Sequence, residues 1–400
     1  MNRITLTRTT LSLALITSGL LTACGGGGGD ADSGNGTLRL SLTDAPACGF
    51  DTAFVTVERV RLHRNATAAD ADGGWSEVVL QTPQRIDLLS LTNGTLAPLG
   101  QTLLPAGNYT QLRLVLSENT AANPLANAVR PTGSTTELPL TTPSAQQSGL
   151  KLKVNIDVPQ DRIADFAIDF DTCKSFVRAG NSGRVLLKPV LSVLPILSNA
   201  GQRIQGWLSP GLVAAGATVS VQSAGVPVRA TPPDATGKFV LYPVPAGNYD
   251  LVITAAGRVN AVMTGVPVST SAFTTLGSET ARIDIPVSAA SHPVAGIFTV
   301  TGSSVDTGGS VRVTQALTGG PTVEVGSVNA LSNNGSYSVT LPAGAPVRLG
   351  YLAGAQTFSF AADAASAGLF RLTGTATGFA SGKNTDIVLT APVVANFSFP

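Results

Sequence analysis

The sequence predicts an all-β protein made of tandem antiparallel β-sandwiches, Ig-like or transthyretin-like, and two observations support this prediction. Among 400 residues there are 43 Gly and 25 Pro, whereas only 12% of the residues are charged. Short segments of alternating apolar and polar residues recur along the chain, and turn-forming residues separate them. This combination is typical of exported sandwich proteins.

The first element is an export signal. Arg3 and Arg8 precede an apolar run from Leu11 to Leu21, and the run is followed by a small residue and Cys24 in the sequence LTAC. These features define a signal peptide, because the run is too short for a membrane-spanning helix. LTAC also resembles the lipobox of bacterial lipoproteins, which implies that residues 1–23 are removed and that Cys24 is acylated.

Residues 24–36 follow as a glycine-rich tether, which we expect to be flexible because glycine leaves the backbone unrestricted. The acyl chains on Cys24 would anchor the protein to a membrane. By resemblance to the sorting rule of bacterial lipoproteins, Gly25 directly after the lipidated residue implies the outer membrane. The sequence leaves open whether the protein faces the periplasm or the cell surface.

The first expected domain covers residues 37–198. In LKLKVNIDV, residues 150–158, apolar and polar side chains alternate strictly, as in a strand with one buried face. The parity of the apolar residues changes between Val57 and Val60, which predicts a β-bulge near Glu58 and Arg59. The segment IDLLSL, residues 86–91, predicts a short helical stretch.

Two further sandwiches are expected at residues 203–287 and 292–400. In the second domain, Asp234 and Gly237 of DATGKF predict a tight turn between strands. In the third, NNGSYSVTLPAGAPVRLGY corresponds to TGKFVLYPVPAGNYDLVIT, so this domain is interpreted as a degenerate repeat of the second.

These segments resemble two known families. SLTDAPACGFDTAFVTVERVRLH, LPAGNYTQLRLVL and DFAIDFDTCKSFVRAGNSGRVLLKPV together resemble DUF4382, a family of bacterial envelope lipoproteins with no established activity. RIQGWLSPG and DATGKFVLYPVPAGNYDLVITAAGR resemble the carboxypeptidase regulatory-like domain. The second resemblance implies a transthyretin-type sandwich that serves as a binding or spacer module and not as a catalyst.

The pentapeptide PAGNY occurs at residues 105–109 and 245–249, and a third, altered copy begins at Leu341. Each copy joins two strand-like segments, and its glycine can adopt a positive φ at no steric cost. We therefore predict a shared corner, in which the rings of Tyr109 and Tyr249 pack inward while their hydroxyls bond to nearby backbone.

After Cys24 only Cys48 and Cys173 remain, and an oxidising envelope compartment favours a disulfide between them. Such a bond would bring Asp44, Asp169 and Asp171 close together. Clustered carboxylates are suitable ligands for calcium. The alternative is that these carboxylates are solvated or cap turns, and no other cofactor is expected.

Catalysis and nucleic-acid binding are not expected. His63 and His292 lie in different domains, and neither accompanies a nucleophile, so no general base is recognisable. The formal net charge is +1 without a basic cluster, which argues against nucleic acid as a partner. Trp75 follows a polar loop, where it either offers a stacking surface for a glycan or anchors the next strand.

These observations predict a non-enzymatic outer-membrane lipoprotein that binds or scaffolds another component of the cell envelope, either a protein or a glycan. One alternative is a carbohydrate-binding lipoprotein that uses its sandwich loops. Another is an adhesin-like surface protein stabilised by calcium.

Overall fold

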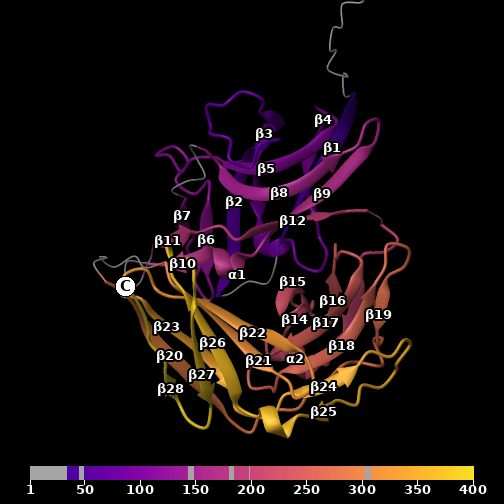
Figure 1. Ribbon diagram of the computed structural model, residues 1–400, viewed down its shortest axis with the longest axis vertical. Coiled ribbons are helices and arrows are strands. Elements are labelled where there is room, and N and C mark those ends of the chain that lie inside the picture. The colour runs from indigo at the N-terminus through magenta and orange to yellow at the C-terminus, as the bar shows by residue number, and fades with distance from the viewer. Residues whose placement is uncertain (1–33, 45–48, 143–147, 180–183, 198, 302–307) are drawn as a thin grey trace, which may run out of the picture. The chain divides into compact units, whose positions relative to one another are not determined.

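The computed structural model describes residues 34–44, 49–142, 148–179, 184–197, 199–301 and 308–400. Residues 34–400 form one compact unit, whose regular secondary structure is almost entirely β-strand (Figure 1), as the composition and the alternation predicted. The helical elements are η1 (Leu88–Ser90), α1 (Thr172–Ser175), α2 (Pro210–Ala214) and η3 (Ala364–Ser366). Among the described residues, no helix combines the length and the apolar character needed to cross a membrane.

The first sandwich has two sheets around one apolar core. The smaller sheet has the order β12 (Leu191–Pro195), β9 (Ile163–Phe170), β1 (Asn35–Asp44), β4 (Ala97–Pro105). The larger has the order β10 (Phe176–Arg178), β11 (Val185–Leu187), β7 (Leu138–Thr141), β6 (Ala128–Pro131), β2 (Phe50–His63), β5 (Gly107–Leu116), β8 (Leu150–Val158), with β3 (Ser76–Asp87) paired to β2. Leu40, Leu62 and Leu112 are fully buried between them.

Three local predictions for this sandwich are confirmed. The pairing of β2 with β3 and β5 shifts register between Val57 and Arg59, which is the expected bulge. The 3-10 helix η1 lies where the helical stretch was expected, and the Asp87 side chain caps it by accepting from the Leu89 amide. Strand β8 exposes Lys151 and Lys153, whereas Leu150 and Leu152 are buried and Val154 is half-buried.

The second sandwich also has two sheets. One has the order β16 (Lys238–Leu241), β13 (Ile204–Trp207), β19 (Thr274–Leu276). The other has the order β15 (Val226–Thr231), β14 (Thr218–Ser223), β17 (Gly247–Thr254), β18 (Ala261–Val268), β24 (Val347–Gly350), β25 (Ala361–Ala362). Its core contains Phe239 and Leu241, as their alternation in the sequence indicates.

The third sandwich has one sheet in which β20 (Ser291–Val300) pairs with β23 (Ser336–Pro342), β28 (Val393–Val394) and β29 (Phe397–Phe399). Its second sheet has the order β22 (Thr322–Asn329), β21 (Ser310–Ala316), β26 (Leu369–Thr375), β27 (Lys383–Val388). Phe298 and Phe397 stack in the core with their ring centroids 5.2 Å apart.

The strand pairing departs from the expected boundaries in two places. Strand β1 begins at Asn35, inside the expected tether of residues 24–36. Strand β24 leaves the third sandwich and pairs in parallel with β18 of the second, where Val347 joins the second core (Figure 1). The expected third domain, residues 292–400, is therefore not continuous, because residues 347–362 complete the preceding sheet. The sheets are also not purely antiparallel, since β1 pairs in parallel with β9 and β13 with β19.

The PAGNY corner is a crossing between the two sheets of a sandwich. The first copy joins β4 to β5 and the second joins β16 to β17, in each case from the smaller sheet to the larger. The hydroxyl of Tyr109 donates to the Pro105 carbonyl at 2.9 Å, and that of Tyr249 donates to the Pro245 carbonyl at 2.8 Å. Both rings are buried, so the predicted corner is confirmed.

Candidate functional site

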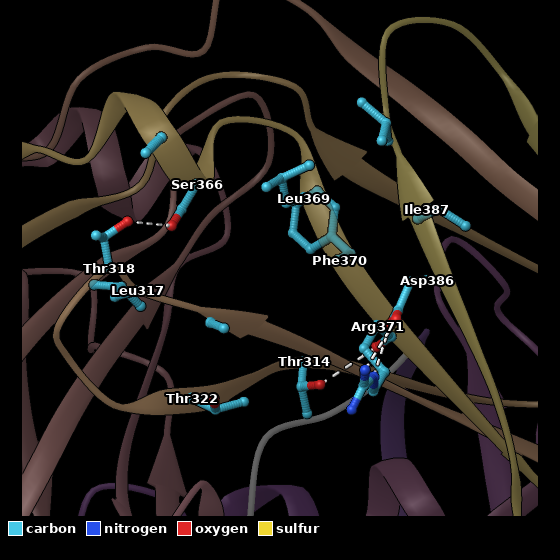
Figure 2. A pocket seen from close by; sticks show the side chains of 13 residues that line it. Thr314, Leu317, Thr318, Thr322, Ser366, Leu369, Phe370, Arg371, Asp386 and Ile387 are labelled. Carbon is cyan, nitrogen blue, oxygen red and sulfur yellow. Dashed lines mark hydrogen bonds and ion pairs between the residues drawn. The ribbon is translucent and has the colours of Figure 1, made fainter.

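A groove of about 560 Å³ lies beside the exposed face of strands β26 and β27 (Figure 2). Apolar and hydroxyl side chains dominate its lining, together with one charged pair. The lining residues are Thr314, Ala316, Leu317, Thr318, Thr322, Ala365, Ser366, Leu369, Phe370, Arg371, Asp386, Ile387 and Val388.

Strand alternation explains the floor of the groove. Along β26, Phe370 and Leu372 point into the core, so Leu369 and Arg371 point outward. The register of β26 and β27 places Leu369 opposite Val388 and Arg371 opposite Asp386. Leu369 is 42% exposed and Val388 is 62% exposed, so the groove presents aliphatic surface to solvent.

The charges in the groove already have partners. Arg371 donates to both carboxylate oxygens of Asp386, from Nε at 2.7 Å and from Nη2 at 2.9 Å (Figure 2). This hydrogen-bonded pair lowers the pKa of Asp386 and raises the pKa of Arg371. Neither group is therefore poised to transfer a proton near neutral pH.

Hydroxyl groups form the far wall of the groove. The Thr318 and Ser366 oxygens lie 3.4 Å apart (Figure 2), and the Ser366 hydroxyl also bonds to Asp363 at 3.0 Å. The Thr318 backbone amide donates to Asp363, and this bond lowers the pKa of that carboxyl. The lining contains no histidine or cysteine, and the carboxylate that accepts from Ser366 is a weak base because its pKa is lowered.

Trp75 lies away from this groove and is engaged by its own sandwich. Its ring centroid lies 4.5 Å from the guanidinium carbon of Arg61 and 4.3 Å from that of Arg113. The indole nitrogen donates to the Ala69 carbonyl at 3.1 Å. The centroids of the Trp75 and His63 rings lie 5.0 Å apart. These contacts favour the interpretation of Trp75 as an anchor for the loop before β3.

Arg113 is the residue that fixes this loop, and the sequence analysis did not single it out. It is fully buried and donates to the carbonyls of Ala68 and Ser148 and to the Asp70 carboxylate. Burial lowers its pKa, although Asp70 opposes that effect. On β5 it lies on the face opposite Leu112 and Leu114, and the loop that contains Ala68 and Asp70 covers it there.

The acidic cluster surrounds an arginine in place of the expected calcium ion. Asp44 and Asp169 are both buried, and the Arg229 guanidinium from the second sandwich pairs with Asp169. Arg229 also donates to the Thr43 hydroxyl at 2.5 Å and to the Asp44 carbonyl at 3.0 Å. Burial lowers the pKa of Arg229 to about 10, and the Asp44 charge acts in the opposite direction.

Asp171, the third expected ligand, caps a helix. Its side chain accepts from the Lys174 amide at 3.0 Å at the start of α1, which is the turn-capping alternative considered for these carboxylates. Within the described part of the chain, no group of three His, Cys, Asp or Glu side chains is placed to hold a metal ion. The cluster thus joins two sandwiches through an ion pair.

Of the three cysteines, only Cys173 lies within the described residues. Cys24 and Cys48 lie outside the described residues, so acylation and the Cys48–Cys173 disulfide stay predictions. The neighbours of the two cysteines do meet: Arg178 donates to the Gly49 carbonyl at 2.6 Å, and the rings of Phe50 and Phe176 lie 5.5 Å apart. This proximity is compatible with the expected pairing.

Comparison with known proteins gives a family for the first sandwich. Residues 35–189 match the family described as "Domain of unknown function (DUF4382)". The chain contains a DUF4382 domain. The matched residues cover the first sandwich except β12 and include Trp75 and the acidic cluster. No curated protein matches the chain.

Solved structures offer only distant similarities. A streptococcal ancillary pilin is 11% identical, with 92% of this chain and 99% of that chain covered and a TM-score of 0.18. The major pilin SpaA of Corynebacterium diphtheriae is 10% identical, with 91% and 99% covered and a TM-score of 0.18. A type II cohesin-X-dockerin complex of Acetivibrio cellulolyticus is 24% identical, with 21% of this chain and 56% of that chain covered and a TM-score of 0.18.

Proposed function

We propose that this chain is a non-enzymatic cell-envelope lipoprotein whose folded part acts as a binding and scaffolding module. The observation that carries the proposal is the chemistry of the groove on β26 and β27. An aliphatic floor, a hydroxyl wall and an ion pair that is already satisfied suit the binding of an apolar surface. They do not supply the base and nucleophile that hydrolysis requires.

The contacts between the sandwiches support the scaffolding part of the proposal. Arg229 joins the second sandwich to the first. The Gln222 side chain of the second exchanges two hydrogen bonds, at 2.7 and 2.8 Å, with the backbone of Glu324 in the third. Asn329 of the third donates to the Lys174 carbonyl of the first at 2.9 Å. Because these contacts join the three sandwiches, they can hold a binding surface in a fixed orientation.

Photo-crosslinking in intact cells tests the binding part. A benzophenone amino acid placed at Leu369 or Val388 is expected to capture a discrete envelope component. The matched control is Val79, which is 64% exposed on β3 of the first sandwich. If positions 369 and 388 gave the same products as position 79, the groove would not be the binding surface.

Membrane fractionation tests the lipoprotein part. The wild-type protein is expected in the outer-membrane fraction, and Cys24→Ala is expected to release it into the soluble fraction, because the acyl chains provide the anchor. Equal membrane retention of both proteins would contradict acylation at Cys24. Protease treatment of intact cells then distinguishes the periplasmic face from the cell surface.

Carbohydrate binding is the second candidate, and no contact in the groove favours it. The Trp75 ring, its expected platform, is occupied by Arg61 and Arg113. Reproducible binding on a glycan array that Trp75→Ala abolishes would restore this candidate.

A further inference from the structure

An exposed apolar pair lies on the outer face of the smaller sheet of the first sandwich. Thr37 of β1 pairs directly with Leu103 of β4 on one side and with Ile163 of β9 on the other. Directly paired residues point to the same face of a sheet. Leu103 is 69% exposed and Ile163 is 57% exposed, so two large aliphatic side chains flank one threonine in solvent.

The pair lies beside the point where the amino-terminal segment joins the folded unit. Gly34 accepts a hydrogen bond from the Ala106 amide at 2.8 Å, and Asn35 accepts one from the Asp161 amide at 3.0 Å. The segment therefore leaves the sandwich between the corner that follows Leu103 and the turn that precedes Ile163. The apolar pair is only two residues along β1 from Asn35.

The next row of the same face is electrically balanced. Arg39 donates from its Nε to the Asp165 carboxylate at 2.9 Å, and Gln101 lies opposite Arg39 on β4. This hydrogen-bonded pair raises the pKa of Arg39, so the guanidinium stays charged and paired. The apolar pair is thus not surrounded by an excess charge that would keep it away from lipid.

We propose that Leu103 and Ile163 contact the bilayer surface when the protein is anchored. This inference rests on the proposed acylation of Cys24. A glycine-rich segment with the length of residues 24–33 spans on the order of 20 Å or less. The anchor therefore keeps this end of the sandwich close to the headgroup region, where aliphatic side chains gain by leaving water. The occupant of the apolar pair is lipid.

The test uses full-length acylated protein in liposomes. An environment-sensitive NBD fluorophore is attached at Leu103→Cys or Ile163→Cys, and nitroxide-labelled lipids serve as quenchers. Val226→Cys is the control, since Val226 is 58% exposed at the start of β15 in the second sandwich. The protein without an introduced cysteine gives the background labelling. We expect blue-shifted emission and severalfold stronger quenching at positions 103 and 163 than at 226.

The outcomes separate this inference from the proposed function. If the protein floats with liposomes but all three positions are quenched equally, the anchor stands and the lipid contact is wrong. If emission at 103 and 163 is blue-shifted without liposomes in the Cys24→Ala protein, the chain itself covers the pair and the inference is again wrong. If the acylation-competent protein does not float, both proposals fail.

Discussion

Two charged residues in this protein, Arg229 and Lys174, form ion pairs that hold neighbouring sandwiches together. Arg229 is 2% exposed, and its partners Thr43, Asp44 and Asp169 all belong to the first sandwich. Lys174 shows the same principle, since its Nζ lies 3.0 Å from Glu324 of the third sandwich. Burial acts to lower the pKa of Lys174, but the carboxylates of Asp171 and Glu324 outweigh it and raise that pKa.

Removal of the Arg229 side-chain charge tests this role. Arg229→Met is expected to destabilise the protein by about 3–5 kcal/mol, because it leaves the Asp169 carboxylate buried without its partner. Urea unfolding measures the change. The double variant Arg229→Met/Asp169→Leu should recover much of the loss, since neither charge then remains buried.

Arg371→Met is the matched control, because the Arg371–Asp386 pair is exposed to solvent. Its unfolding midpoint is expected to stay at the wild-type value. If Arg229→Met lowered the free energy of unfolding no more than this control does, Arg229 would not hold the two sandwiches together.

At the scale of elements, the turn at Asp234 is held by local hydrogen bonds, as its sequence predicts. The carboxylate of Asp234 accepts from the Thr236 amide at 2.8 Å, the Thr236 hydroxyl at 2.6 Å and the Lys238 amide at 3.0 Å. Gly237 has a φ of 88°, which a residue with a side chain adopts only with strain. The turn predicted from DATGKF is thus confirmed.

This turn should weaken in acid. Burial acts to raise the pKa of Asp234, but the bonds from Thr236 and Lys238 outweigh it and lower the pKa below its ordinary value of 3.8. A carboxyl group whose pKa is lower in the folded protein than in the unfolded chain stabilises the fold at pH values above the unfolded-chain pKa. This stabilisation is lost as the pH falls through the pKa of the folded protein. The difference in unfolding free energy between wild type and Asp234→Ala should therefore shrink as the pH falls below 3.8. A difference that stays constant in urea unfolding from neutral to acidic pH would contradict this.

The third copy of the corner lacks the tyrosine, and its chain takes a different path. Where the first two copies have Tyr109 and Tyr249, the third has Pro346, which has no hydroxyl to bind the preceding turn. The following strand β24 does not cross to the other sheet of its own sandwich but joins β18 of the second. The place next to β21 is taken instead by β26.

At the scale of the whole molecule, the segment 347–362 covers the edge of the second sandwich. Without β24, strand β18 would present an open edge, and open edges promote pairing with other chains. Leu349, Tyr351, Phe358 and Phe360 also pack against the second core from this segment. This segment therefore extends the hydrophobic core of the second sandwich.

Replacement of residues 347–362 by a flexible linker of equal length is expected to convert the protein from a single species into a self-associating one. The exposed edge of β18 and the uncovered apolar side chains are the physical reason. Size-exclusion chromatography with light scattering measures the outcome. Leu352→Ser is the control, because Leu352 is 71% exposed outside the strand. A monodisperse product with the linker would show that the edge needs no cover.

The sequence by itself determined the features that depend on neighbouring residues: the alternation of β8, the bulge after Val57, the Asp234 turn and the two PAGNY corners. These features follow from backbone geometry and side-chain period, which act over a few residues.

Only the tertiary structure decided which groups meet across the sandwiches. Arg229 fills the acidic cluster, Arg113 lies beneath Trp75, and β24 completes a sheet that is not its own. Each of these contacts joins residues far apart in the chain, and the alternation of a strand says which side chains point outward without saying what will cover them. The groove and the apolar pair at Leu103 and Ile163 are among the outward surfaces that remain uncovered, and the functional proposals rest on them.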